Sequence, residues 1–188
     1  MSAVATRSYT VEEYLELDAD AEDERYEFQN GSVIPMADAE PEHNQIKDNV
    51  AAELRMRLQP EGGWVMTSDQ RVRVSFGYVY PDVVVACEPS YEDTSPRTLQ
   101  NPELIAEVTS EATKARDQGD KLVAYTDLES LREYWVIDPD KTLLAQYTRE
   151  SDGWQYLAHT ALSDTVTSTA FEMEISLQNL YALVLDSE

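Results

Sequence analysis

The alternation of hydrophobic and polar residues predicts helices in two stretches of the N-terminal half. Between Glu42 and Leu58 an apolar residue recurs at every fourth position, which places one apolar stripe along a helix. These residues are Ile46, Val50, Leu54 and Leu58. A shorter helix is expected to begin after Thr10, because Thr10 and Glu13 have the spacing of a capping box. Pro60 and the glycine pair at 62–63 are expected to end the longer helix.

Short apolar runs of strand length dominate the rest of the chain. The turn Asn30-Gly31 predicts a hairpin between residues 25–28 and 32–36. Further strands are expected at 64–67 paired with 70–75, and at 79–86, 104–108, 133–137, 143–148, 154–158 and 171–175. Helices are expected from 111 to about 128 and within 177–185, and the polar segment 91–100 is expected to be a loop. This order predicts an α/β or α+β fold, a mixed sheet flanked by helices.

Length and cysteine content narrow the class of protein. A chain of 188 residues without repeats or Gly/Ser linkers suits one domain over residues 1–188. Because no stretch approaches roughly 18 consecutive apolar residues and the first ten residues lack a signal-peptide core, we expect a cytoplasmic protein without a membrane span. Cys87, the single cysteine, ends the apolar run YPDVVVAC and is expected to be a core residue in a reducing cytosol.

The charge balance is strongly acidic. The 37 acidic and 14 basic residues give a formal net charge of −23 at pH 7. Such a balance opposes nonspecific attraction to nucleic acid, whose affinity comes mainly from Lys and Arg that neutralise phosphates. It favours divalent cations, and most of these carboxylates suit a solvated surface. Any binding to DNA is therefore expected to be weak, sensitive to salt and dependent on a divalent metal.

Two carboxylates interrupt strands that otherwise suit a buried position. Asp82 precedes the run Val83 to Val85, and Glu107 lies between Ala106 and Val108. A charged carboxylate in such a place is costly unless it is paired, hydrogen-bonded or bound to metal. Magnesium prefers oxygen ligands and usually takes one or two protein carboxylates together with several waters. Asp82, Glu107 and the backbone carbonyl of Val108 are therefore candidate ligands of one metal ion.

The helix expected after the second of these strands carries a candidate lysine. Asp117 and Lys121 are four residues apart and share one face, together with Lys114. One interpretation is an ordinary surface ion pair, worth a few tenths of a kcal/mol. In the other, the Lys121 ammonium reaches back over the strand end and stabilises charge on an attacking hydroxide or a phosphoryl oxygen. The spacing alone leaves both open.

Several motifs together resemble one known family. They are Tyr9 to Tyr14, Arg25 to Phe28, Asn30-Gly31, His43, Tyr80 to Val85, Ile105 to Ser110, Asp117 to Lys121, Tyr125 and Glu133 to Pro139. This set is similar to the Uma-type family of restriction-endonuclease-like proteins, which are abundant in cyanobacteria and belong to the PD-(D/E)XK superfamily. The resemblance covers roughly residues 9–145.

The resemblance implies a restriction-endonuclease-like fold and a metal-dependent endonuclease that hydrolyses DNA with Mg²⁺ or Mn²⁺, as a homodimer. In such a site Asp82 and Glu107 hold the metal and Lys121 assists catalysis, with Asp117 and Glu27 in support. The usual lysine of the superfamily lies two residues after the second acid, where this chain has Thr109. The resemblance places the lysine role at Lys121 instead.

Other positions keep two interpretations. Glu27 is either an outer metal ligand or proton acceptor, or an exposed strand carboxylate, and His43 is either a site residue or a surface or capping histidine. Arg71 and Arg73 share a strand face, where they would contact phosphates or lie in solvent. The pair Tyr134-Trp135 is expected in the core. One cysteine and two distant histidines make no zinc site, and no GxSxG, GxGxxG or phosphate-loop motif occurs.

Two rival functions remain open. The first is a binding or regulatory module that keeps the nuclease fold without turnover, which the acidic balance and Thr109 favour. The second is a carboxylate-based hydrolase of another substrate, with Glu107 and Asp82 as acid and base. Metal dependence would separate this hydrolase from a nuclease.

Overall fold

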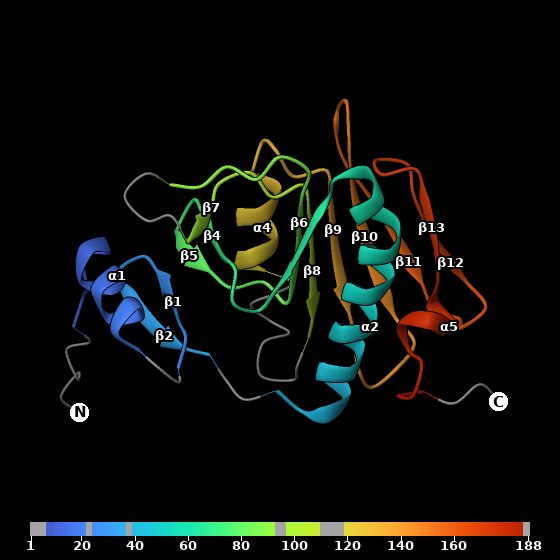
Figure 1. Cartoon of the computed structure of the whole chain (residues 1–188), viewed down its shortest axis with the longest axis horizontal. Helices are drawn as coiled ribbons and strands as arrows, with labels where there is room; N and C mark the ends of the chain where they lie inside the picture. The colour runs from blue at the N-terminus through green and yellow to red at the C-terminus, as the bar shows by residue number, and fades with distance from the viewer. Residues whose placement is uncertain (1–6, 22–23, 37–38, 93–96, 110–118, 186–188) are drawn as a thin grey trace.

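A six-stranded mixed sheet forms the centre of the computed structural model, which describes residues 7–21, 24–36, 39–92, 97–109 and 119–185 (Figure 1). The strand order is β11-β10-β9-β8-β6-β3. The strands are β3 (Trp64–Thr67), β6 (Val83–Ala86), β8 (Leu104–Val108), β9 (Glu133–Ile137), β10 (Leu144–Glu150) and β11 (Gly153–His159). Only β8 and β9 are parallel neighbours in this sheet. The predicted mixed sheet is thus confirmed.

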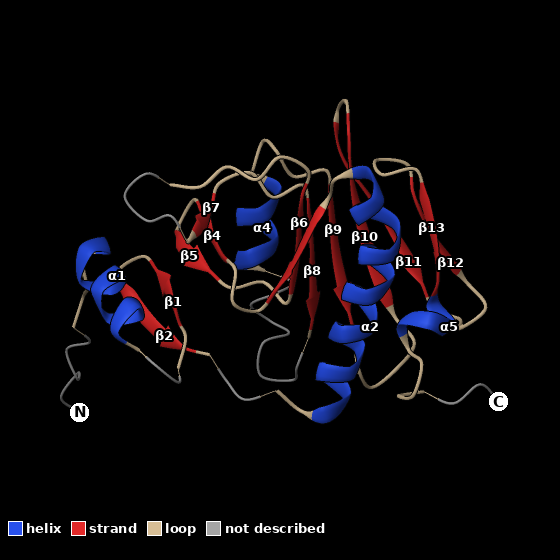
Figure 2. Cartoon of the chain, in the orientation of Figure 1, coloured by secondary structure: helices blue, strands red, loops and turns tan. Residues whose placement is uncertain are grey.

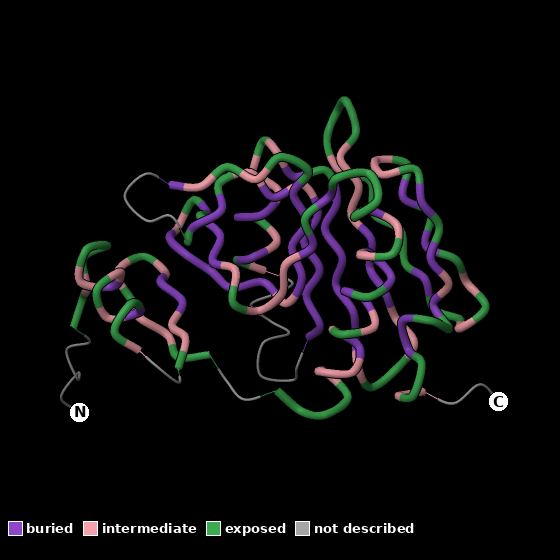
Figure 3. Tube along the Cα trace, in the orientation of Figure 1, coloured by how far each residue is buried: buried purple, intermediate pink, exposed green. Residues whose placement is uncertain are grey.

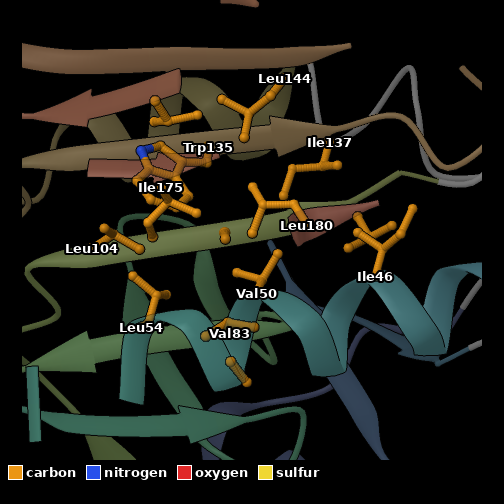
Figure 4. Packing of buried hydrophobic residues seen from close by; sticks show 14 of the residues in the cluster. Ile46, Val50, Leu54, Val83, Leu104, Trp135, Ile137, Leu144, Ile175 and Leu180 are labelled. Atoms are coloured by element: carbon orange, nitrogen blue, oxygen red, sulfur yellow. The ribbon is translucent and has the colours of Figure 1, made fainter. Parts of the chain in front are cut away.

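Helices cover both faces of this sheet (Figure 2). On one face α2 (Pro41–Leu58), followed by a 3₁₀ turn at Gln59–Glu61, lies beside the hairpin β12 (Thr165–Ser168) and β13 (Met173–Ser176) and the short α5 (Leu177–Leu180). The apolar stripe of α2 packs against the sheet as predicted: Ile46, Val50 and Leu54 are fully buried beside Val83 and Trp135 (Figure 4). Full burial of each aliphatic side chain stabilises the fold by about 1.5–3 kcal/mol.

The opposite face is covered by α4 (Asp120–Thr126). Ala124 and Tyr125 of this helix pack on Val84, Ile105 and Tyr134. The helix predicted from 111 to about 128 is confirmed over α4, and residues 110–118 lie outside the described ranges. Tyr134 and Trp135 are fully buried, so their assignment to the core is confirmed.

A second sheet of five strands carries the N-terminal part. Its order is β2 (Ser32–Pro35), β1 (Tyr26–Gln29), β5 (Gly77–Val79), β4 (Arg71–Val74) and β7 (Thr98–Leu99). The predicted hairpin turn is present, with positive φ angles of 48° at Asn30 and 88° at Gly31, as a two-residue turn of this type requires. The helix α1 (Val11–Asp20) begins with the capping box expected at Thr10 and Glu13.

A buried ion pair fastens α1 to this second sheet. Arg71 Nη1 lies 2.6 Å from Asp18 Oδ2, and the Tyr80 hydroxyl donates to the same oxygen at 2.5 Å. The expectation that Arg71 contacts phosphates or lies in solvent is therefore wrong. Arg73 shares its face, since both guanidinium groups lie over the Tyr78 ring. It pairs with Glu92 at 2.8 Å.

Three predictions about strands were wrong because strand pairing depends on distant partners. The predicted burial of Cys87 was also wrong. Residues 64–67 and 70–75 belong to different sheets, because β3 pairs with β6 while β4 pairs with β5 and β7. The run 79–86 is divided between β5 and β6. The segment expected as a loop contains β7, and β12 was not predicted. Cys87 is exposed because β6 ends one residue earlier.

Among the described helices, none is both long and apolar enough to span a membrane.

Candidate metal and nuclease site

Asp82 and Glu107 lie side by side on neighbouring strands of the central sheet. Asp82 directly precedes β6, and the antiparallel register pairs Val83 with Ala106, next to Glu107 on β8. The backbone N–H of Asp82 donates to Glu107 Oε2 at 3.4 Å. The N–H of Val108 donates to Asp82 Oδ2 at 2.8 Å. The structure therefore brings together the two carboxylates that the sequence analysis selected.

Two side chains of α4 converge on Glu107. Lys121 Nζ lies 2.9 Å from Glu107 Oε1, and the Tyr125 hydroxyl donates to the same oxygen at 2.7 Å. Lys121 and Tyr125 are one helical turn apart, so they share the face that packs on the sheet. Burial and then the charge of Glu107 hold the pKa of Tyr125 well above its usual value, so the phenol stays a donor. Lys121 is buried, and its interpretation as a solvated surface ion pair is wrong.

Glu27 reaches the same ammonium group from the other sheet. Its Oε1 lies 3.2 Å from Lys121 Nζ and accepts from the Tyr80 N–H at 3.3 Å. Glu27 is only 2% exposed, so the alternative of an exposed strand carboxylate is wrong. Its neighbour Phe28 points to the opposite face and packs against the Tyr14 ring. Strand alternation therefore directs Glu27 toward α4.

His43 lies against the other carboxylate. It occupies the first turn of α2, and its Nε2 lies 3.1 Å from Asp82 Oδ2. The Nδ1 atom is buried without a hydrogen-bond partner among the described residues. Burial opposes protonation of the ring, but the hydrogen bond and charge of Asp82 outweigh it, so the pKa of His43 is raised. Of the two interpretations of His43, the structure supports contact with the candidate site.

The described part of this cluster brings several charged side chains close together. Glu27, Asp82 and Glu107 contribute three carboxylates, whereas Lys121 supplies one ammonium and His43 at most one further positive charge. Like charges in a partly buried cluster destabilise one another. A cation bound beside Asp82 and Glu107 would lower the repulsion between these carboxylates.

The available donors suit a metal ion that retains water. The described parts of the chain hold no ready-made group of three or more His, Cys, Asp or Glu ligands. Asp82 and Glu107 supply hard carboxylate oxygens, and the Val108 carbonyl points to the same side of β8 as its N–H, toward Asp82. Two carboxylates, one carbonyl and waters form the ligand set that Mg²⁺ usually takes. The donors therefore fit Mg²⁺ or Mn²⁺ better than an ion that needs a full protein cage.

The remaining candidate positions are Asp117, Lys114 and Thr109. Asp117 and Lys114 lie outside the described residues. Thr109 is buried, and its N–H and hydroxyl both donate to the Ile137 carbonyl on β9, on the side of β8 away from Asp82. The ammonium that contacts Glu107 comes from α4 instead. Sequence reasoning missed the role of Tyr125, although its position four residues after Lys121 was a readable signal.

Comparisons with known proteins agree with this fold. The model of the Uma2 family, described as "Putative restriction endonuclease", matches residues 11–179. A crystal structure described as "a putative nuclease belonging to DUF820" from Anabaena variabilis superposes with a TM-score of 0.76 at 17% identity. It covers 94% of this chain and 99% of that chain, so the two share one fold.

Two uncharacterized proteins of Synechocystis sp. (strain PCC 6803) are also similar in sequence. One is 34% identical over 155 residues, 81% of this chain and 87% of the relative. The other is 25% identical over 173 residues, 90% of each. The match of the family model along almost the whole chain and the shared restriction-endonuclease-like fold lead to one conclusion: this chain belongs to the Uma2 family of nuclease-like proteins.

Proposed function

We propose that this protein is a metal-dependent endonuclease that hydrolyses phosphodiester bonds in DNA. The observation that carries the proposal is the buried Lys121 ammonium, which is held between Glu107 and Glu27. Asp82, the other proposed metal ligand, lies next to Glu107. Burial of a lysine is costly and requires compensating partners. A surface ion pair would not need this arrangement, whereas a phosphate-cleaving site requires both carboxylates and a fixed positive charge.

Asp82 and Glu107, with the Val108 carbonyl, would hold Mg²⁺ or Mn²⁺. Such an ion, when bound, lowers the pKa of a coordinated water and neutralises charge that develops on the phosphate. Lys121 places its ammonium beside Glu107, where it orients the attacking water and stabilises the phosphoryl oxygen. Glu27 holds that ammonium from the other side, and the Tyr125 hydroxyl holds the Glu107 carboxylate. Asp117 is proposed as a further supporting carboxylate.

The substrate would approach a strongly acidic molecule. Because the protein has a net charge of −23, its binding to DNA would depend on the local positive charge of the metal site. This binding would fall steeply as the salt concentration rises. We further propose a homodimer, which would place two sites against one duplex.

A calorimetric titration tests the metal site. Mn²⁺ should bind the wild-type protein, and binding should be lost in Asp82→Ala and Glu107→Ala because each removes one of two carboxylate ligands. Glu88→Ala, which removes an exposed carboxylate, should bind like wild type. Cleavage of plasmid DNA with Mg²⁺ or Mn²⁺ should follow the same order of variants. Equal metal affinity in all four proteins would overturn the proposed ligands.

A module without turnover is the second candidate, and Thr109 at the usual lysine position favours it. Under this alternative the metal still binds through Asp82 and Glu107, but no DNA is cleaved. Metal binding without cleavage of supercoiled, linear or single-stranded DNA would support the module over the enzyme.

A further inference from the structure

The outer edge of the central sheet is formed by β11, a long strand with an open side. It is the last strand in the sheet order and pairs only with β10 in the described part of the chain. Tyr156 is 57% exposed and Leu157 is 52% exposed, on opposite faces. The hairpin that joins β10 to β11 projects beyond the sheet (Figure 1), and it is exposed (Figure 3). An open strand edge presents a row of backbone donors and acceptors that can pair with another strand.

This edge lacks the features that usually prevent strand pairing. Charged side chains, proline, bulges or short length protect most edge strands. From Gly153 to Ser163 the chain contains no Asp, Glu, Lys, Arg or Pro, although 27% of all residues are charged. The segment is therefore a part of this acidic molecule that a second acidic molecule can approach with little local repulsion.

The other sheet edges are better protected. The opposite edge strand, β3, has four residues, and the Arg55 side chain donates to its Val65 carbonyl. In the five-stranded sheet, β2 ends at Pro35 and β7 has two residues. Among the described edges, only β11 combines seven residues with no such protection.

We propose that β11 pairs antiparallel with β11 of a second copy, with the two-fold axis at Tyr156. Tyr156 is the middle residue of the strand, so this register pairs all seven residues. Trp154 would then lie opposite the partner's Ala158, and Gln155 opposite the partner's Leu157. A large side chain meets a small one at both Trp154 positions, which is the complementarity that close packing requires.

The same register keeps the acidic residues apart. Asp152, which precedes the strand, would face the partner's Thr160, and Asp164 lies beyond the paired segment. Like charges directly opposite each other destabilise a strand pair, and none occurs here. The pairing would join the two six-stranded sheets into one continuous sheet.

The pairing also would connect the two candidate sites, a consequence that rests on the proposed function. Tyr125, which donates to Glu107, begins a row of tyrosine rings through Tyr134 and Tyr147 to Tyr156. Successive ring centroids are 5.0, 5.9 and 5.2 Å apart. In the proposed dimer the row continues through the partner's Tyr156 toward the partner's Glu107.

Sedimentation of the full chain tests the interface. Wild type should dimerise as its concentration rises, and Tyr156→Lys should shift the dissociation constant upward by at least tenfold. The added positive charge reduces overall repulsion between acidic copies, so any loss of dimer must come from the edge itself. The control Val123→Lys makes the same charge change at a residue on α4 that is 61% exposed, and it should dimerise like wild type. A wild type that stays monomeric, or a Tyr156→Lys dimer as tight as wild type, would overturn the proposal.

Disulfide cross-linking tests the register. In a Cys87→Ser background, Tyr156→Cys should cross-link to its own copy in a second molecule on oxidation. Trp154→Cys alone should not, whereas Trp154→Cys together with Ala158→Cys should. Efficient cross-linking of Trp154→Cys alone would exclude the register. Neither experiment measures cleavage, so a dimer without nuclease activity would refute the proposed nuclease and leave the interface standing. An active monomer would refute the dimer and its interface and leave the proposed nuclease standing.

Discussion

The Lys121 ammonium lies between two buried carboxylates of the candidate site, Glu27 and Glu107. Lys121→Ala removes it, so turnover on DNA should fall by about 10²-fold or more, the scale of a lost transition-state contact. Affinity for Mn²⁺ should not weaken, because lysine is not a ligand. Lys141→Ala, which removes an exposed lysine, should leave turnover unchanged. Turnover of Lys121→Ala equal to wild type would show that the ammonium has only a structural role.

The same substitution should also change stability. Without Lys121, Glu107 and Glu27 lose the ammonium that both contact, and breaking a buried ion pair costs about 3–5 kcal/mol. Urea unfolding in metal-free buffer should show this loss. Mn²⁺ should restore part of the stability, because the ion replaces the missing positive charge. A variant as stable as wild type without metal would mean that the two ion pairs of Lys121 do not stabilise the fold.

The two histidines should respond to pH in opposite directions. The folded-state pKa of His43 is raised by Asp82 above the value in the unfolded chain, about 6.5. Its stabilisation is therefore fully present below that unfolded value and is lost as pH rises through the folded-state pKa. Burial lowers the pKa of His159 in the folded state. The stability that neutral His159 contributes is therefore lost as pH falls below the unfolded-state pKa of about 6.5.

Urea unfolding of His43→Gln and His159→Gln across this pH range, in metal-free buffer, measures both effects. The deficit of His43→Gln should be largest at acidic pH and shrink toward alkaline pH, and that of His159→Gln should change in the other direction. A deficit of His43→Gln that does not change with pH would show that His43 is not charged against Asp82.

Single residues were predictable where the sequence carried a local contradiction. Asp82 and Glu107 could be selected because each places a charge in an apolar run. The contact of Glu27 with Lys121 could not be read in this way, since the two residues are far apart in sequence and reach each other from β1 and from α4. The exposure of Cys87 also escaped prediction, because an apolar run does not reveal where its strand ends.

At the level of elements, the buried pair of Asp18 and Arg71 should decide how firmly α1 is held. Arg71→Met leaves Asp18 buried without its cation and should lower the free energy of unfolding by about 3–5 kcal/mol. The double variant Asp18→Leu with Arg71→Met should lose less, since no charge remains unpaired. Asp69→Asn, in an exposed pair with Arg25, should change it by at most about 0.5 kcal/mol. Equal losses in the Arg71 and Asp69 variants would contradict this view.

Helices were predicted more reliably than strand pairings, and for a physical reason. A helix such as α2 is specified by contacts within the segment, so its apolar stripe and its end at Leu58 are visible in the sequence. A strand is completed by a partner elsewhere in the chain. β3 and β4 are close in sequence, yet each has its partners in a different sheet, and no local pattern distinguishes this from a hairpin.

For the whole molecule, net charge should dominate the encounter with DNA. Binding of Lys121→Ala to a labelled duplex, followed by fluorescence anisotropy, should be weak, require Mn²⁺, and decline as salt increases from about 50 to 200 mM. This variant allows binding to be measured while cleavage is slow. Tight binding without metal at physiological salt would indicate a basic surface, which the net charge of −23 does not suggest.

The crossing between the two sheets has a consequence for how this architecture can vary. Only Tyr80, Pro81 and Asp82 separate β5 from β6, and the first and last of them hold Glu27, Asp18 and Glu107 through hydrogen bonds. Inserting or deleting one residue here would rotate or displace every one of these contacts together. The length of this crossing is therefore fixed by its contacts, and we expect insertions or deletions to be tolerated at outlying hairpins such as residues 151–152 but not at this junction.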